Sequence, residues 1–115
     1  DLNYKTVSPI LVGTYFYNKK TLTFHMEKHI PSLTTEVLVN VFLYSGENEP
    51  ERTISSIMKI GDKSYTLYLH TYGQDAYAFD NNIMWIPVDK SKAISFTSGY
   101  RGNNCRAHVY IIGHR

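Results

Sequence analysis

Residues 65–88, YTLYLHTYGQDAYAFDNNIMWIPV, decide the fold class that the sequence predicts. Their first part alternates with the period of two that is typical of a β-strand: Tyr65, Leu67 and Leu69 share one face, and Tyr68, His70 and Tyr72 share the other. Gly73 then opens a polar loop, and an apolar run returns through Trp85. We therefore expect two strands joined by an aromatic-rich loop, with Trp85 in the core because apolar residues surround it.

Strand-like segments recur along the chain at intervals of about ten residues. The clearest core strand is EVLVNVFLY at 36–44, which is apolar on both faces apart from Asn40. Residues 21–30 predict a strand with one polar face, and the serines within 52–60 interrupt the alternation and predict a β-bulge. A turn after residue 60 predicts a hairpin, and further strands are expected at 10–17, 64–72, 92–100 and 107–115.

The fold class follows from this pattern. No convincing period of 3.6 residues and no alternation of strands with helices is seen in the sequence, so the chain is predicted to be all-β. We expect an antiparallel β-sandwich or jelly roll of about seven to eight strands. With 115 residues, the chain is expected to form a single domain over residues 1–115.

Charge and hydropathy exclude several classes of protein. The formal net charge is +2 and the Lys and Arg residues are spread along the chain, so no basic stripe predicts nucleic-acid binding. No run of about 20 apolar residues is present, and we expect no membrane insertion. The one cysteine, Cys105, excludes an intrachain disulfide, and a chain starting at Asp1 looks like a mature or trimmed product, for which a removed leader would imply export.

The motifs of common enzyme classes are missing from the sequence. It contains no G-x-S-x-G, P-loop, C-x-x-C or H-E-x-x-H pattern. Cys105 and His108 are a nucleophile and a base by residue type, but residues three apart on a strand point to opposite faces. We therefore expect no enzymatic activity.

Two polar loops, at 73–82 and 100–106, are the expected ligand-binding site. They combine aromatic rings with short polar side chains, which suits sugars because C–H patches stack on rings while hydroxyls need donors and acceptors. If both loops lie at the same end of the sandwich, they form one shallow patch. The alternative is a local role, since Asp and Asn are good turn formers. The predicted ligand-binding residues are Tyr72, Gln74, Asp75, Tyr77, Asp80, Asn82, Tyr100, Arg101, Asn103 and Arg106.

Metal binding is a weaker alternative for these residues. Asp75 and Asp80 offer the oxygen ligands that calcium prefers, but their spacing matches no recognised calcium loop, and we predict no cofactor. On the predicted strand at 21–30, His25 and His29 are four residues and roughly 13 Å apart. This separation is too large for both to bind one metal ion.

The C-terminal third carries two patterns, N-x-M-W-x-P at 82–87 and N-x-C-x-A-x-V-Y-I-I-G-x-R at 103–115. They resemble a module of extracellular proteins from corals and related invertebrates. In size, strand density and a final apolar strand, the chain is also similar to small invertebrate lectins of the H-type, which form trimers or hexamers and bind galactose or N-acetylgalactosamine. The resemblance implies a secreted homo-oligomer with glycans or glycoproteins as partners. The paired cysteines of the snail members are absent, and no sugar-binding position carries over.

Ten tyrosines in 115 residues also favour a binding surface, because Tyr supplies contact area with a polar tip. The leading hypothesis is an extracellular, multivalent lectin for galactose-type or related sugars. The alternative is a non-enzymatic structural or assembly head of the trimeric C1q/TNF-like kind. The aromatic loop is expected to be exposed in a lectin and buried between subunits in an assembly head.

Overall fold

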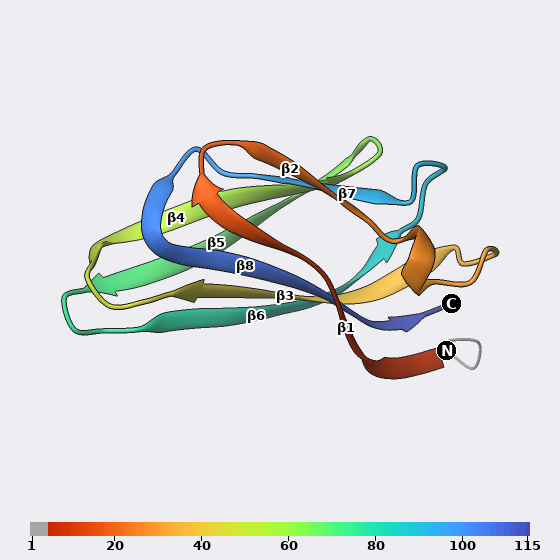
Figure 1. Ribbon diagram of the computed structural model, residues 1–115, viewed down its shortest axis with the longest axis horizontal. Coiled ribbons are helices and arrows are strands. Elements are labelled where there is room, and N and C mark those ends of the chain that lie inside the picture. Colours follow the sequence, from red (N-terminus) through yellow and green to blue (C-terminus); the bar gives the residue numbers. More distant parts are fainter. Residues whose placement is uncertain (1–4) are drawn as a thin grey trace.

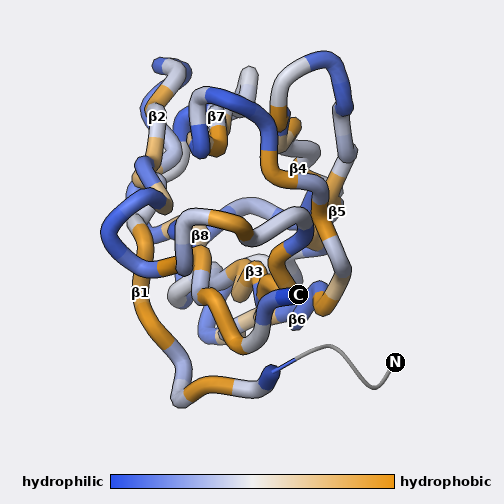
Figure 2. Tube along the Cα trace, turned by 90° about the vertical axis from the view of Figure 1, so that its right-hand side faces the viewer, coloured by the Kyte–Doolittle hydropathy of each residue, from blue (hydrophilic) through white to orange (hydrophobic). Residues whose placement is uncertain are grey.

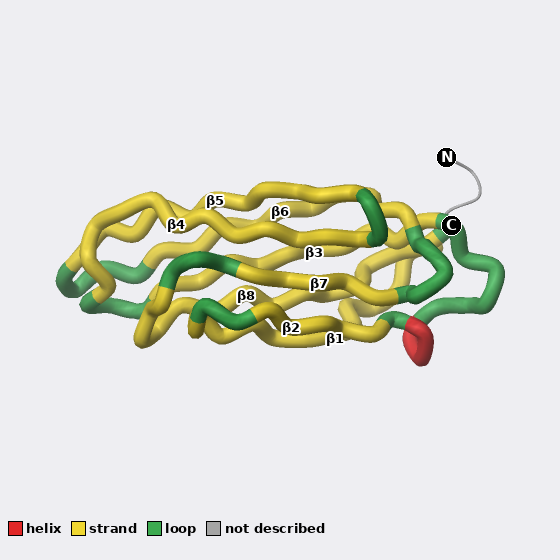
Figure 3. Tube along the Cα trace, turned by 90° about the horizontal axis from the view of Figure 1, so that it is seen from above, coloured by secondary structure: helices red, strands yellow, loops and turns green. Residues whose placement is uncertain are grey.

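The computed structural model describes residues 5–115 and contains two four-stranded sheets packed face to face (Figures 1 and 3). One sheet has the order β1-β8-β3-β6 and the other has the order β2-β7-β4-β5. The strands are β1 (Lys5–Asn18), β2 (Thr21–His25), β3 (Glu36–Ser45), β4 (Glu49–Ile60), β5 (Lys63–Gly73), β6 (Ala78–Pro87), β7 (Ala93–Thr97) and β8 (Arg101–His114). The predicted all-β antiparallel sandwich is confirmed.

The strand pairing makes this sandwich a jelly roll. β1 pairs with β8, β2 with β7, β3 with β6 and β4 with β5, all antiparallel. This nested pairing is that of one long antiparallel ribbon folded over into two sheets. The predicted hairpin joins β4 to β5 at Gly61, where φ is +58°. Every other connection between consecutive strands passes from one sheet to the other.

The core lies between the two layers, which are seen end-on in Figure 2. Successive side chains of a strand point to opposite faces, and β3 shows this most clearly. Val37, Val39, Val41 and Leu43 are fully buried, whereas the residues between them face outward. The same alternation therefore determines which side chains form the outer surface of each sheet.

The serines of β4 do not cause a bulge, so that prediction is wrong. Ser56 faces the core between Ile54 and Met58, and its Oγ lies 2.8 Å from the hydroxyl of Tyr17. Burial raises the pKa of Tyr17 to about 12, which keeps this buried phenol neutral. The irregular register of β4 lies near its start, between residues 49 and 52.

Several strand boundaries, and the position of Trp85, also differ from the sequence predictions. β2 ends at His25, because the chain turns into a 3-10 helix at Glu27–His29, so the predicted strand at 21–30 is too long. β6 and β8 extend into both predicted loops, which shortens the connections before them to 74–77 and 98–100. Trp85 lies opposite Leu38 on the outer face rather than in the core. Within residues 5–115, no helix is long and apolar enough to cross a membrane.

Candidate functional site

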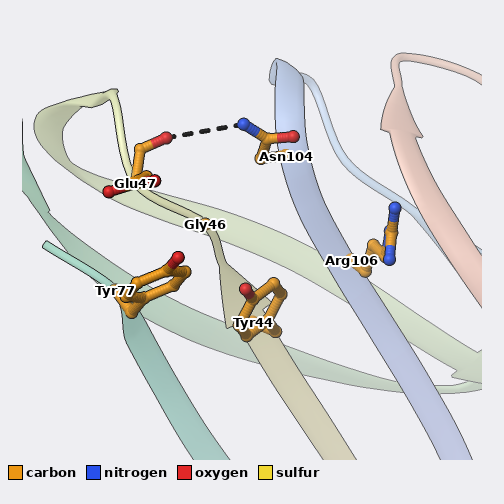
Figure 4. A pocket seen from close by; sticks show the side chains of 6 residues that line it. All are labelled: Tyr44, Gly46, Glu47, Tyr77, Asn104 and Arg106. Atoms are coloured by element: carbon orange, nitrogen blue, oxygen red, sulfur yellow. Dashed lines mark hydrogen bonds between the residues drawn. The ribbon is translucent and has the colours of Figure 1, made fainter. Parts of the chain in front are cut away.

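Four connections lie at one end of the sandwich, the left-hand end in Figure 1: β1 to β2, β3 to β4, β5 to β6 and β7 to β8. The two polar segments therefore lie at the same end, which is the condition under which they were expected to form one patch. A cleft of about 260 Å³ lies at this end (Figure 4). It is lined by Tyr44, Gly46, Glu47, Tyr77, Asn104 and Arg106.

Tyr44 and Tyr77 form the aromatic wall of the cleft. Tyr44 is the last outward-facing residue of β3, and Tyr77 immediately precedes β6. Their ring centroids are 6.3 Å apart and their planes differ by 29°, which is a stacked arrangement. Because Tyr77 is 60 % exposed, the pair leaves aromatic surface available to a ligand.

Glu47, Asn104 and Arg106 form the polar wall. Arg106 lies opposite Tyr44 in the register of β8 and β3, and its guanidinium carbon is 5.4 Å from the ring centroid of Phe16. The Asn104 Nδ2 donates a hydrogen bond of 3.4 Å to the carbonyl of Glu47 (Figure 4). This wall therefore offers a carboxylate acceptor, guanidinium donors and an amide that does both.

Gly46 allows the end of β3 to approach β8 closely. Its N–H donates to the carbonyl of Asn104 at 3.0 Å. A Cβ at residue 46 would lie 2.9 Å from the Cβ of Asn104, which is closer than van der Waals contact permits. A larger residue here would therefore displace Asn104 from the cleft.

A buried carboxylate next to the cleft fixes the start of β8. Glu49 accepts hydrogen bonds from the Tyr100 hydroxyl at 2.7 Å and from the N–H groups of Asn103 and Asn104 at 2.7 and 3.0 Å. Burial opposes ionisation of Glu49, but these bonds and one from the Cys105 thiol outweigh it and lower the pKa of the carboxyl. Burial and the bond to Glu49 raise the pKa of Tyr100 to about 12.

Of the predicted ligand-binding residues, Tyr77 and Arg106 line the cleft. Tyr100 and Asn103 instead bond to Glu49, through a side chain and a backbone N–H respectively. The bond to Glu49 explains the polar tip of Tyr100, whereas Asn103 contributes only its backbone, and neither residue lines the cleft.

The remaining predicted residues are dispersed. Gln74 and Asp75 form the turn after β5, where Asp75 has a φ of +59°. Asp80 and Asn82 lie opposite core-facing residues of β3, so their side chains are not on the outer face that carries Tyr44. The others are Tyr72, on the outer face of β5, and Arg101, exposed at the start of β8. The ten predicted residues therefore do not form one patch.

Four residues of the cleft are not among those predicted from the sequence: Tyr44, Gly46, Glu47 and Asn104. The alternation within 36–44 carries a signal for Tyr44, because it places this residue on the face opposite to the valines. Asn104 is adjacent to the predicted Asn103, but neighbouring residues of a strand point in opposite directions. No local sequence pattern marks Gly46 and Glu47 as site residues, because they line the cleft only where β8, which is distant in the sequence, lies beside them.

The outer face of the β1-β8-β3-β6 sheet is rich in aromatic residues, and we call three successive rows of it the aromatic face. The register aligns Phe16, Arg106, Tyr44 and Phe79 in one row, Thr14, His108, Phe42 and Asn81 in the next, and Leu11, Tyr110, Asn40 and Ile83 in the third. Phe42 is central: its ring centroid lies 5.9 Å from that of Phe79 and 6.1 Å from that of His108. The rings thus form a continuous surface across three strands.

Cys105 and His108 lie on opposite sides of β8. Cys105 is buried, and burial followed by the charge of Glu49 raises the pKa of its thiol to about 11. His108 is on the aromatic face, where its Nδ1 lies 2.9 Å from Thr14 Oγ1. This geometry provides no nucleophile–base pair between them. In the part of the chain that the structure describes, no group of three or more His, Cys, Asp or Glu side chains is placed to hold a metal ion.

Together the fold and the two surface features define an eight-stranded jelly roll with a small polar cleft beside an aromatic sheet face. A scan against models of protein families finds no match, and a search of curated proteins finds none either. The resemblance to H-type lectins therefore stays a prediction.

Proposed function

We propose that this protein is a non-enzymatic assembly module that forms homo-oligomers through the aromatic face. The observation that carries the proposal is the exposure of four large apolar side chains on the edge strands β1 and β6, on either side of the partly buried rings of β3 and β8. Leu11, Phe16, Phe79 and Ile83 are 49, 55, 68 and 60 % exposed. Monomeric soluble proteins rarely leave apolar patches larger than a few hundred Å² uncovered. The jelly-roll pairing also fits the assembly head that the sequence suggests as an alternative.

The area of the face is sufficient for association. At roughly 100 Å² of exposed apolar surface each, these four side chains present about 400 Å² per subunit. A typical stable interface buries about 800 Å² per partner, of which somewhat more than half is apolar. Covering the four side chains in two subunits stabilises association by about 20 kcal/mol at ~25 cal/mol per Å². From this value for complete burial, the ~4–15 kcal/mol of lost rigid-body freedom, the ordering of side chains and the desolvation of the polar groups are subtracted.

The polar residues of the face are compatible with burial between subunits. Burial, and then the positive charge of Arg106, lower the pKa of His108. The ring is therefore neutral at neutral pH and stacks on Phe42 with an interplanar angle of 18°. Asn40 and Asn81 are uncharged, and Arg106 lies in an outer row, where interfaces tolerate charge.

The outer face of the other sheet has a contrasting composition. Its small hydroxyl side chains and one lysine keep it hydrated: Thr21, Thr23, Thr53, Ser55, Lys59, Ser64, Thr66, Ser95 and Thr97. Tyr68 and Tyr72, both on the edge strand β5, are exposed aromatic residues of this face. The two faces therefore provide a matched pair of test positions on one molecule.

Light scattering during gel filtration of Ile83→Asp and Tyr68→Asp tests this proposal. The two side chains are 60 and 59 % exposed, and both substitutions place a charge on an outer sheet face. We expect Ile83→Asp to elute as a 13.3 kDa monomer with an unfolding temperature near that of the wild type. Tyr68→Asp is expected to retain the oligomer. A wild-type monomer at every concentration, or an unchanged oligomer in Ile83→Asp, contradicts the proposal.

We also infer an extracellular setting, which the resemblance to extracellular invertebrate modules supports. In such a setting, a homo-oligomer presents each surface site several times, so weak sites act together. Fractionation of the source tissue tests this inference. Recovery of the protein from the extracellular matrix or fluid is expected, and recovery from the cytosol alone contradicts it.

A further inference from the structure

We propose that the cleft between Tyr44 and Arg106 binds one ring of a neutral saccharide. This function is separate from self-association, although the cleft lies at the end of the same sheet face. Ile83 is opposite Asn40, which is four residues from Tyr44 along β3. At about 3.3 Å per residue, the cleft is roughly 13 Å from the row of Ile83. The aromatic face is centred on the row of Phe42, so the row that contains Tyr44 and Arg106, with the cleft beside it, lies at the margin of the interface.

The size of the cleft suits a single ring. Its volume of about 260 Å³ lies just below the ~300–1,000 Å³ of pockets for drug-sized ligands. Glu47, Tyr77 and Arg106 are all exposed, so the cleft is accessible from solvent. It therefore admits the terminal residue of a longer glycan without rearrangement of the strands.

The lining combines the two kinds of surface that a pyranose requires. The stacked rings of Tyr44 and Tyr77 offer apolar area to C–H patches. Glu47 only accepts hydrogen bonds, Arg106 only donates them, and Asn104 does both. Each sugar hydroxyl both donates and accepts, so adjacent hydroxyls find partners of each kind in this cleft.

The charges of the lining favour a neutral ligand. Glu47 carries a negative charge and Arg106 a positive charge, so these two side chains contribute no net charge. A phosphate or sulfate would meet the carboxylate of Glu47. A hydrocarbon would cover Glu47, Asn104 and Arg106 without pairing them, at about 1–3 kcal/mol for each polar group left buried and unsatisfied. A neutral, hydroxyl-rich ring avoids both costs.

The positions of these groups are set before a ligand arrives. Tyr44 and Arg106 stand opposite each other on adjacent strands. Asn104 is held through its backbone by Glu49 and Gly46, and through its side chain by the carbonyl of residue 47. Such preorganisation reduces the entropy lost on binding.

Saturation-transfer NMR with methyl glycosides of galactose, glucose, mannose and N-acetylglucosamine tests the proposal on the purified chain. We expect at least one glycoside to bind with a Kd on the order of 1 mM. Tyr77→Ser and Glu47→Gln are expected to weaken that binding at least tenfold. Tyr72→Ser removes a tyrosine that is 62 % exposed on the other sheet and is expected to leave the affinity within twofold. Thermal unfolding of each variant confirms that it is folded.

Two outcomes would overturn the saccharide site: no transfer to any glycoside at about 10 mM, or equal affinity in Tyr77→Ser and the wild type. Molar mass measured on the same samples separates this proposal from self-association. An oligomer that binds no glycoside overturns the saccharide site alone. A monomeric wild type whose binding is lost in Tyr77→Ser overturns self-association alone.

Discussion

Replacing Glu49 with alanine removes the acceptor that holds the start of β8 beside the cleft. The carboxylate is 4 % exposed and accepts from the Tyr100 hydroxyl and from two backbone N–H groups. Each donor left without a partner costs about 1–3 kcal/mol, but donors that share one acceptor are not additive. We expect Glu49→Ala to lower the free energy of unfolding by about 2–4 kcal/mol.

Thermal unfolding followed by circular dichroism measures this effect. For a chain of this size, about 1 kcal/mol corresponds to ~4 °C in Tm, so Glu49→Ala is expected to lose roughly 8–16 °C. Glu49→Gln is the matched control, because its amide oxygen still accepts from the N–H groups of Asn103 and Asn104. It is expected to lose about half as much. A Tm of Glu49→Ala within about 2 °C of the wild type refutes the structural role of this carboxylate.

The pH dependence provides an independent check on the same group. The pKa of Glu49 is lower in the folded protein than its usual value of 4.5, so the unfolded chain binds more protons in acid. The contribution of Glu49 to stability is therefore complete above about pH 4.5 and is lost as the pH falls through the lowered pKa. The difference in Tm between wild type and Glu49→Gln is expected to shrink in that range. A difference that stays constant down to pH 2 contradicts this assignment.

Two further predictions concern residues in the interior. A Cβ at residue 13 would lie 2.2 Å from the ring of Phe24, so Gly13→Ala is expected to destabilise the fold by about 1–3 kcal/mol. Gly99→Ala is the control, because a Cβ there would have no neighbour within 4 Å, and it is expected to leave the Tm nearly unchanged. Equal midpoints of unfolding for the two variants, in heat or in urea, contradict this packing. The Cys105 thiol is buried with a pKa raised to about 11, so it is expected to react with a thiol reagent at pH 8 only after unfolding, and rapid labelling of the native protein contradicts its position.

The fold class is predictable from the sequence because strand alternation is a local signal. The valines of β3 and the turn at Gly61 are sufficient to indicate a buried strand and a hairpin. The exceptions depend on tertiary contacts. Ser56 keeps its place in the core because Tyr17, 39 residues away, supplies a hydrogen-bond partner. Trp85 lies on the outer face, and not in the core, because the register of β6 with β3 pairs it with the outward-facing Leu38.

The candidate site is less predictable because it depends on strands that are distant in sequence. The convergence of the two polar segments follows from the sandwich, and Tyr77 is found in this way. The hydrogen-bond partners of the loop residues cannot be read from the sequence. Glu49 is 51 residues from Tyr100, yet its carboxylate accepts the hydrogen bond of the Tyr100 hydroxyl. The aromatic face is likewise spread over four strands, and only their register assembles it.

Self-association through the aromatic face is tested most directly by sedimentation equilibrium of the unmodified protein. One chain has a mass of 13.3 kDa. We predict a molar mass at micromolar concentration that is an integer multiple of this value greater than one, and that does not change with added salt because the contacts are mainly apolar. A mass of one chain at every concentration would contradict it.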